Sequence, residues 1–247
     1  MTISILLETT TYLVINKPAG IAVHGDGKSD QYTVADWLLE TYPEIKDVGE
    51  PMELYGKKVF RPGIVHRLDK DTSGCLLIAK DQDTYLFFKK QFQEHTIEKI
   101  YHAFVYGSIK ETNLVIDKPI GRSRDSVRKW ATGNQARGEL RDAYTHVTVL
   151  KRIGVEDEKG STEKGTYTFV ECRPKTGRTH QIRVHLKSIN HPIVCDTLYA
   201  EKREKALGFE RLALHARSLA FVGLEQKKIF VEAPYPTDFE KAVAITK

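Results

Sequence analysis

The sequence has little of several features that mark special classes of protein. Only three of its 247 residues are cysteine (Cys75, Cys172 and Cys195), and they form no C-x-x-C pair. Neither a zinc knuckle nor a redox dithiol is therefore indicated. No apolar run approaches the roughly 20 residues needed to span a bilayer, and no basic segment followed by a long apolar run begins the chain as in a signal peptide. A reducing cytoplasm is the expected location.

An excess of charge of one sign is also nearly absent overall, but it is concentrated in one place. Lys and Arg together number 38 against 33 for Asp and Glu, giving a formal net charge of +5. The stretch from Arg122 to Arg141 alone carries +4. Such a segment suits contact with a polyanion, and its candidate contacts are Arg124, Arg128 and Lys129. The alternative is a solvated surface loop.

Three segments have the pattern of helices. Thr33 and Asp36 form a capping-box-like start for a helix that extends to Tyr42. A second helix is expected from about Asp81, with Tyr85, Phe88 and Phe92 as its inward stripe. A third is expected over residues 182–189, where apolar residues recur on one side.

Short apolar or alternating runs predict strands between these helices. They cover residues 12–15, 76–79, 101–106, 143–150 and 166–172. The basic segment 121–138 has little apolar periodicity and is interpreted as an excursion from the sheet, and the polar segment 156–165 as a hairpin tip. Together the patterns predict an α+β chain, a mixed α/β arrangement with much antiparallel sheet.

The segment from Arg61 to Gly74, RPGIVHRLDKDTSG, is the strongest candidate for chemistry. A loop rich in Asp, Thr, Ser and Gly comes directly before a buried strand, and sites tend to be built where a polar loop adjoins rigid scaffold. Taken alone, the HRLD sequence also fits a turn with a local Arg–Asp pair.

A second candidate is the segment from Thr176 to Leu186, TGRTHQIRVHL. It has the features of a helix start, and helix N-termini attract anions. The alternative is an amphipathic helix whose histidines and arginines face water. His180 and His185 are five residues apart, not the four that place two metal ligands on one helix face, so no metal site is indicated.

These two segments and a third, KIYHAFV from Lys99 to Val105, together resemble the three motifs of the RluA-type pseudouridine synthases, in the same order. Flanking pieces agree with the resemblance: NKPAG at 16–20, HPI at 191–193 and LHA at 214–216. The resemblance implies a pseudouridine synthase fold with a largely antiparallel central sheet flanked by helices and loops. It further implies one catalytic domain over residues 1–247, with two sub-lobes sharing one sheet and no N-terminal S4-like module.

The resemblance also implies roles for particular residues. Asp69 matches the essential aspartate, Tyr101 the active-site tyrosine, and Arg183 the arginine paired with that aspartate. Candidate substrate contacts from the same motifs are Arg67, Ile182, His66 and Arg178. Cys195 departs from the family pattern, because similar proteins usually have glycine there.

The activity implied is the conversion of specific uridines in structured rRNA or tRNA to pseudouridine by a monomer, without cofactor or metal. The reaction needs a carboxylate near the sugar in a dry pocket, so Asp69 is expected to be buried, with Arg183 offsetting the desolvation of its charge. A phenol pKa of about 10 is high for a base, so proton transfer by Tyr101 needs local help. The alternative is a non-catalytic RNA-binding protein in which the same residues only grip phosphate.

Overall fold

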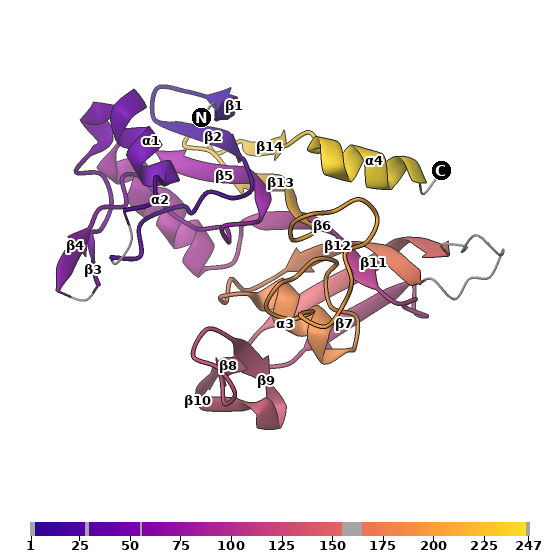
Figure 1. Ribbon diagram of the computed structural model, residues 1–247. Coiled ribbons are helices and arrows are strands. Elements are labelled where there is room, and N and C mark those ends of the chain that lie inside the picture. The colour runs from indigo at the N-terminus through magenta and orange to yellow at the C-terminus, as the bar shows by residue number, and fades with distance from the viewer. Residues whose placement is uncertain (1–2, 28–29, 55, 155–164, 246–247) are drawn as a thin grey trace. The chain divides into compact units, whose positions relative to one another are not determined.

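The computed structural model describes residues 3–27, 30–54, 56–154 and 165–245 (Figure 1). The chain divides into two compact units. Unit 1 comprises Met1–Glu98 and Ala216–Pro234, and unit 2 comprises Lys99–His215 and Tyr235–Lys247. Helices occur together with mostly antiparallel strands, so the predicted α+β class is confirmed. Within the described ranges, no helix has the length and apolar character that crossing a membrane requires.

The main sheet of unit 1 has β5 near its centre. Its strands follow the order β1-β2-β5-β13, and β14 also pairs with β13. Every residue of β5 is buried, as expected for a continuous apolar run covered on both faces. The strands are β1 (Ser4–Glu8), β2 (Tyr12–Lys17), β5 (Ser73–Ala79), β13 (Leu214–Val222, whose first two residues belong to unit 2) and β14 (Lys228–Glu232).

The two helices of unit 1 begin where the sequence predicts. Helix α1 (Val34–Thr41) has Thr33 as N-cap with a complete capping box to Asp36. Helix α2 (Gln82–Gln93) begins after Asp81, whose Oδ1 accepts a hydrogen bond from the Thr84 amide at 2.8 Å. The inward stripe of α2 is confirmed, since Tyr85 and Phe88 are buried. Three short elements complete unit 1: the 3₁₀ turn η1 (Pro43–Ile45) and the hairpin strands β3 (Met52–Leu54) and β4 (Lys57–Val59).

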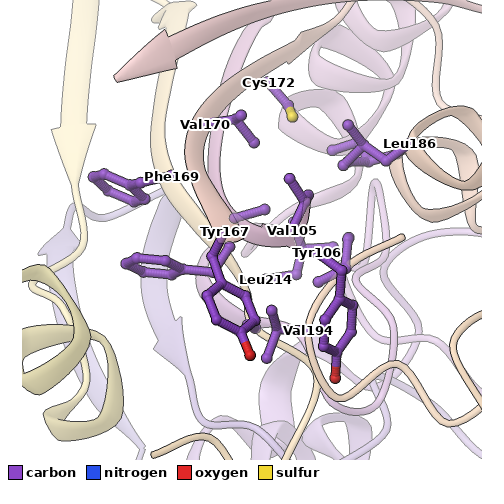
Figure 2. Packing of buried hydrophobic residues seen from close by; sticks show 14 of the residues in the cluster. Val105, Tyr106, Tyr167, Phe169, Val170, Cys172, Leu186, Val194 and Leu214 are labelled. Atoms are coloured by element: carbon purple, nitrogen blue, oxygen red, sulfur yellow. The ribbon is translucent and has the colours of Figure 1, made fainter. Parts of the chain in front are cut away.

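The main sheet of unit 2 is antiparallel throughout, in the order β6-β12-β11-β7. Its strands are β6 (Glu98–Tyr106), β7 (Asn113–Asp117), β11 (Tyr144–Gly154) and β12 (Thr166–Pro174). The core packs helix α3 (Gln181–Ser188) and helix α4 (Thr237–Ile245) with this sheet. Figure 2 shows side chains from β6, β12 and α3 packed together in the same buried cluster.

The basic segment forms more structure than its sequence predicts. Strands β8 (Ile120–Ser123), β9 (Trp130–Thr132) and β10 (Ala136–Arg141), with the 3₁₀ turn η2 (Gly133–Gln135), make a separate antiparallel sheet (Figure 1). The segment lies outside the main sheets, as an excursion would, but its three strands were not predicted. Most side chains of β10 are exposed, and β8 and β9 are only four and three residues long, so none of the three shows a clear apolar alternation. The predicted hairpin tip lies outside the described residues, except for Gly165.

Candidate active site

The HRLD loop of unit 1 presents Asp69 between two exposed basic side chains. Arg67 and Lys70 are exposed and Leu68 is buried, so the leucine anchors the loop while the cations reach solvent. Asp69 itself is partly exposed. The expectation of a fully buried carboxylate is thus not met in this structure.

A buried lysine ties this loop to the NKPAG segment. Lys17 is completely buried, and its ammonium donates hydrogen bonds to the carbonyls of Pro18 at 2.8 Å, Ile21 at 2.8 Å and Lys70 at 3.0 Å. The Gly20 amide donates to the same Lys70 carbonyl at 2.9 Å. Charge-assisted bonds of this kind are strong. Lys17 therefore fixes the backbone one residue beyond Asp69, a role that was not predicted from the sequence.

His66 anchors the other side of the loop. Its Nε2 accepts a hydrogen bond from the Leu77 amide at 3.0 Å, and its ring stacks on Phe92 with centroids 4.5 Å apart. The ring thereby holds the loop against β5 and α2. The geometry supports a positioning role for His66, while direct substrate contact stays a prediction.

Gly74 allows the loop to enter β5. Its φ is +112°, and a Cβ at this position would lie 2.1 Å from the carbonyl oxygen of Ala216. Both the backbone conformation and the close approach exclude a larger residue. The backbone conformation and close packing at Gly74 thus explain why the HRLDKDTSG segment ends in glycine.

The polar side chains of α3 in unit 2 are buried. Arg183 is 7% exposed, and its Nε and Nη2 donate to the two carboxylate oxygens of Asp196, each at 2.8 Å. Asp196 is 1% exposed. The alternative of an amphipathic helix with water-facing arginines and histidines is therefore wrong. Asp196 as the acceptor of a two-pronged bond from Arg183 was not predicted from the sequence.

Asp196 is itself held by the turn that contains it. Its Oδ1 accepts from the amides of Leu198 at 2.9 Å and Tyr199 at 3.1 Å. The guanidinium of Arg183 lies 5.1 Å from the centroid of the Tyr199 ring. Cys195 precedes Asp196 with a φ of 57°, in the left-handed region that favours glycine. The turn therefore keeps the backbone of a glycine despite the cysteine.

Two further residues of α3 hold the helix on its sheet. The side-chain amide of Gln181 donates to the Tyr144 carbonyl at 3.0 Å and to the Thr145 hydroxyl at 3.1 Å. His185 is fully buried, between the Thr145 hydroxyl at 2.9 Å and the Lys118 carbonyl at 3.0 Å. Burial lowers the pKa of His185, and a neutral ring donating to Lys118 and accepting from Thr145 satisfies both bonds.

Tyr101 and Ile182 pack against one buried cluster. Ile182 is 6% exposed and belongs to the core of unit 2, and Tyr101 on β6 is partly buried against it. Lys99, two residues before Tyr101, projects from the same face of β6 because strand side chains alternate. Burial lowers the pKa of Lys99 to about 8.

The basic residues of unit 2 that were predicted to contact RNA differ in the bonds that they already form within the protein. Arg124 and Arg128 are exposed, and Arg124 Nε donates to the Ala136 carbonyl at 3.0 Å. Lys129 forms an ion pair with Glu201 at 2.9 Å. Arg178 Nε donates to the Asp142 carbonyl at 3.1 Å. Part of the charge of this surface is therefore neutralised by the protein itself.

The predicted site residues thus fall into two groups. Unit 1 holds Asp69, Arg67 and His66 in one loop, and unit 2 holds Tyr101, Ile182 and Arg183 around one core. The pairing of Asp69 with Arg183, and the sharing of one sheet by the two units, stay predictions. In the described part of the chain, no group of three or more His, Cys, Asp and Glu side chains is arranged to hold a metal ion.

Comparisons with known proteins agree on one family. The family model described as RNA pseudouridylate synthase matches residues 11–188. An uncharacterized RNA pseudouridine synthase of Synechocystis sp. is 37% identical over 97% of this chain and 67% of that protein. Ribosomal large subunit pseudouridine synthase D of Neisseria meningitidis serogroup B is 34% identical over 100% of this chain and 62% of that protein.

A solved structure adds agreement in the fold. Human RNA pseudouridylate synthase domain containing 4 is similar with a TM-score of 0.72 and 26% identity, over 98% of this chain and 92% of that chain. The chain spans 62–67% of the length of the two curated relatives named above.

Proposed function

The chain belongs to the RNA pseudouridylate synthase family, and we propose that it converts uridine in structured RNA to pseudouridine with Asp69 as its catalytic carboxylate. The observation that carries the proposal is the HRLD loop, in which Lys17 and His66 fix the backbone on either side of an accessible aspartate. Rigidly held side chains on loops are the usual carriers of catalysis.

The reaction itself needs little from the protein beyond placement. The bond from N1 of uracil to C1′ of ribose breaks, the base turns over, and a bond from C5 to C1′ forms. The proton on C5 is lost to a base and N1 gains one, so atoms and charge balance without a cofactor. Asp69 interacts with the ribose or the ring during this exchange, and Tyr101 packs beside the base.

Arg183 supplies an oriented cation in this proposal. The bidentate bond to Asp196 fixes the plane of its guanidinium, and this guanidinium is proposed to pair with Asp69. We expect Arg183→Lys to lose much of the activity, because an ammonium cannot reproduce the fork. Near-normal turnover by this variant would remove the assignment.

The substrate class proposed is structured RNA, with large-subunit ribosomal RNA as the first candidate, since several relatives carry that substrate in their names. A uridine in a stem must be flipped out, at a cost of a few kcal/mol. Contacts to phosphate from Arg67 and from the basic sheet β8–β10 are proposed to offset that cost. We further propose that the protein acts in the cytoplasm as a monomer.

The test is release of tritium from RNA labelled at C5 of uridine, because only rearrangement of the base frees that atom. Wild-type protein should release tritium and form pseudouridine at discrete positions, and Asp69→Asn should reduce the rate by about 10²–10⁴-fold or more. A matched control is Asp71→Asn, two residues away in the same loop, which should retain most of the rate. Tight RNA binding without tritium release by the wild type would instead favour a non-catalytic RNA-binding protein.

Binding is tested separately through its dependence on salt. Replacing Arg124 and Arg128 with methionine should make the logarithm of affinity depend less steeply on the logarithm of salt, by about 0.7–0.9 per lost phosphate contact. Lys129→Met should change the slope less, because Glu201 already pairs with that ammonium. If the salt dependence of RNA affinity were the same for these variants and for the wild type, the basic sheet β8–β10 would not contact the RNA.

A further inference from the structure

In unit 1 Arg67 contacts His24, and the charge of Arg61 acts on His24 and Arg67. Nη1 of Arg67 donates a hydrogen bond to Nε2 of His24 at 3.3 Å. The pKa of His24 is lowered to about 4, by burial first and then by the charges of Arg67 and Arg61. The pKa of Arg61 is likewise lowered, by burial first and then by Arg67. Two guanidiniums and an imidazole therefore form a cluster, named here the Arg61–His24–Arg67 cluster.

His24 has a defined protonation state within this cluster. Nδ1 lies 2.8 Å from the Gly25 carbonyl oxygen, so it carries the proton and donates it. Nε2 is then left to accept from Arg67. His24 is 7% exposed, so a neutral ring is also the form that burial favours. The imidazole adds no charge of its own and fixes the direction of Arg67.

Arg61 has an unused donor. Its Nε is buried and, among the described residues, is the one buried side-chain polar atom without a hydrogen-bond partner. The remaining influences on its pKa come from Tyr85 and Glu50. Glu50 is already bonded to the ammonium of Lys89 at 2.5 Å. Arg61 thus retains both its charge and a free donor.

Neither arginine of the cluster is neutralised by the described part of the chain. No carboxylate there lies within 4.0 Å of the guanidinium of Arg61 or Arg67, whereas Arg183, Arg211 and Arg217 each have such a partner. Like charges that approach without a counterion are unfavourable. Such an arrangement is expected where an anion from outside supplies the missing charge.

We propose that the Arg61–His24–Arg67 cluster binds a backbone phosphate of the RNA substrate. A guanidinium offers Nε–H and Nη–H as two parallel donors that match two oxygens of a phosphodiester. Arg67, which is exposed and held in a fixed direction by His24, can provide that pair, and Arg61 supplies a second cation with an unused donor. Arg67 lies two residues before Asp69, so the phosphate bound is one close to the nucleotide being modified. The inference rests on the proposed function for the identity of the polyanion.

The experiment measures the affinity of the full chain for a uridine-containing RNA stem-loop over a range of salt concentrations. Arg61→Met keeps the apolar stem and removes the charge, and Arg61→Lys keeps the charge without the fork. The control is Lys241→Met, an exposed lysine on α4. Arg61→Met should reduce the salt slope by about 0.7–0.9, the value for one lost phosphate contact. Arg61→Lys should keep the slope but bind more weakly than the wild type, and Lys241→Met should match the wild type.

A second measurement follows the unused donor directly. The Nε–H signal of Arg61 in ¹H–¹⁵N spectra, assigned by its loss in Arg61→Lys, should move downfield when the stem-loop is added to the wild type. This measurement remains decisive if Arg61→Met does not fold. His24→Phe, which removes the acceptor of Arg67 and keeps both charges, should weaken binding.

A salt slope for Arg61→Met equal to that of the control, or an Nε–H signal that does not move at saturating RNA, would overturn the proposal. Tritium release by the wild type is measured beside it. Its absence, with the slope and the signal as expected, would reject the enzyme and keep the phosphate site. Its presence, with slope and signal unchanged, would reject the site and keep the enzyme.

Discussion

The HRLD loop of unit 1 and helix α3 of unit 2 use polar residues in opposite ways. In the loop, Asp69 and Arg67 reach solvent while Lys17 and His66 hold the backbone from behind. In α3, all six residues from Gln181 to Leu186 are buried, and the polar ones bond to groups of their own unit. The HRLD loop therefore exposes its polar side chains, whereas α3 uses its polar side chains for hydrogen bonds inside unit 2. Residue type alone therefore does not show which polar side chains of the two motifs reach solvent.

Two aspartates give the sharpest form of this comparison. Asp196→Ala removes the carboxylate that holds two nitrogens of the buried Arg183 guanidinium, and breaking a buried pair in this way costs about 3–5 kcal/mol. Asp69→Asn in the partly exposed loop should lower the free energy of unfolding by less than Asp196→Ala, because solvent reaches the side chain at this position. Denaturant unfolding of both variants measures the difference.

A double replacement shows how much of the loss in stability comes from leaving one charge of the ion pair buried. Arg183→Met combined with Asp196→Leu removes both charges together, and it should be more stable than Asp196→Ala because no buried charge is left alone. Equal losses for Asp196→Ala and Asp69→Asn would end the contrast between the two segments.

Lys99 is a buried charge without the partners that Lys17 has. Burial lowers its pKa from 10.5 to about 8, so the folded protein gives up this proton more readily than the unfolded chain. The unfolded state binds more protons between those two pH values, and stability from this group therefore rises as pH increases from 8 to 10.5. Below pH 8 the buried ammonium is a net cost.

Lys99→Met is accordingly expected to stabilise the protein at pH 7 by about 1–3 kcal/mol. The gain should shrink as pH rises towards 10.5. Thermal unfolding at pH 7, 8.5 and 10 measures it, with exposed Lys110→Met as the matched control. A gain that does not depend on pH would show that packing, not charge, is responsible.

Replacing Cys195 is expected to have the smallest effect on the free energy of unfolding. Left-handed backbone costs a residue with a Cβ about 1–2 kcal/mol, and glycine offsets part of the gain through the freedom of the unfolded chain. Cys195→Gly should therefore stabilise by less than about 1 kcal/mol, and the loss of the contact from its Sγ to the Phe209 carbonyl reduces the gain further. Cys195→Ala keeps the strain and loses the thiol, so it should be less stable than both the wild type and Cys195→Gly.

Much of the fold follows from local pattern. The caps at Thr33 and Asp81, the buried run of β5 and the helix over residues 182–189 were all predicted from residues close in sequence. The family resemblance is confirmed by the match over residues 11–188. The sheet β8–β10 was not predicted, because β8 and β9 are only four and three residues long and most side chains of β10 are exposed.

The supporting residues of the site were harder to predict than its motifs. Asp196 lies 13 residues beyond Arg183, and Lys17 lies 53 residues before Lys70. No periodicity connects partners so far apart, since only the fold decides that they meet. The NKPAG segment was noted for its resemblance, and its physical purpose became visible only through the contacts of Lys17.

The division of the chain into units has a consequence for its synthesis. Unit 1 needs Ala216–Pro234 as well as the first 98 residues, and unit 2 needs Tyr235–Lys247 as well as its central stretch. The early segment therefore leaves the ribosome before β13 and β14 are synthesised. The edge of β5 that pairs with β13 stays unpaired until more than 130 further residues have been translated. Chaperone dependence during that interval is expected to be highest for the amino-terminal strands.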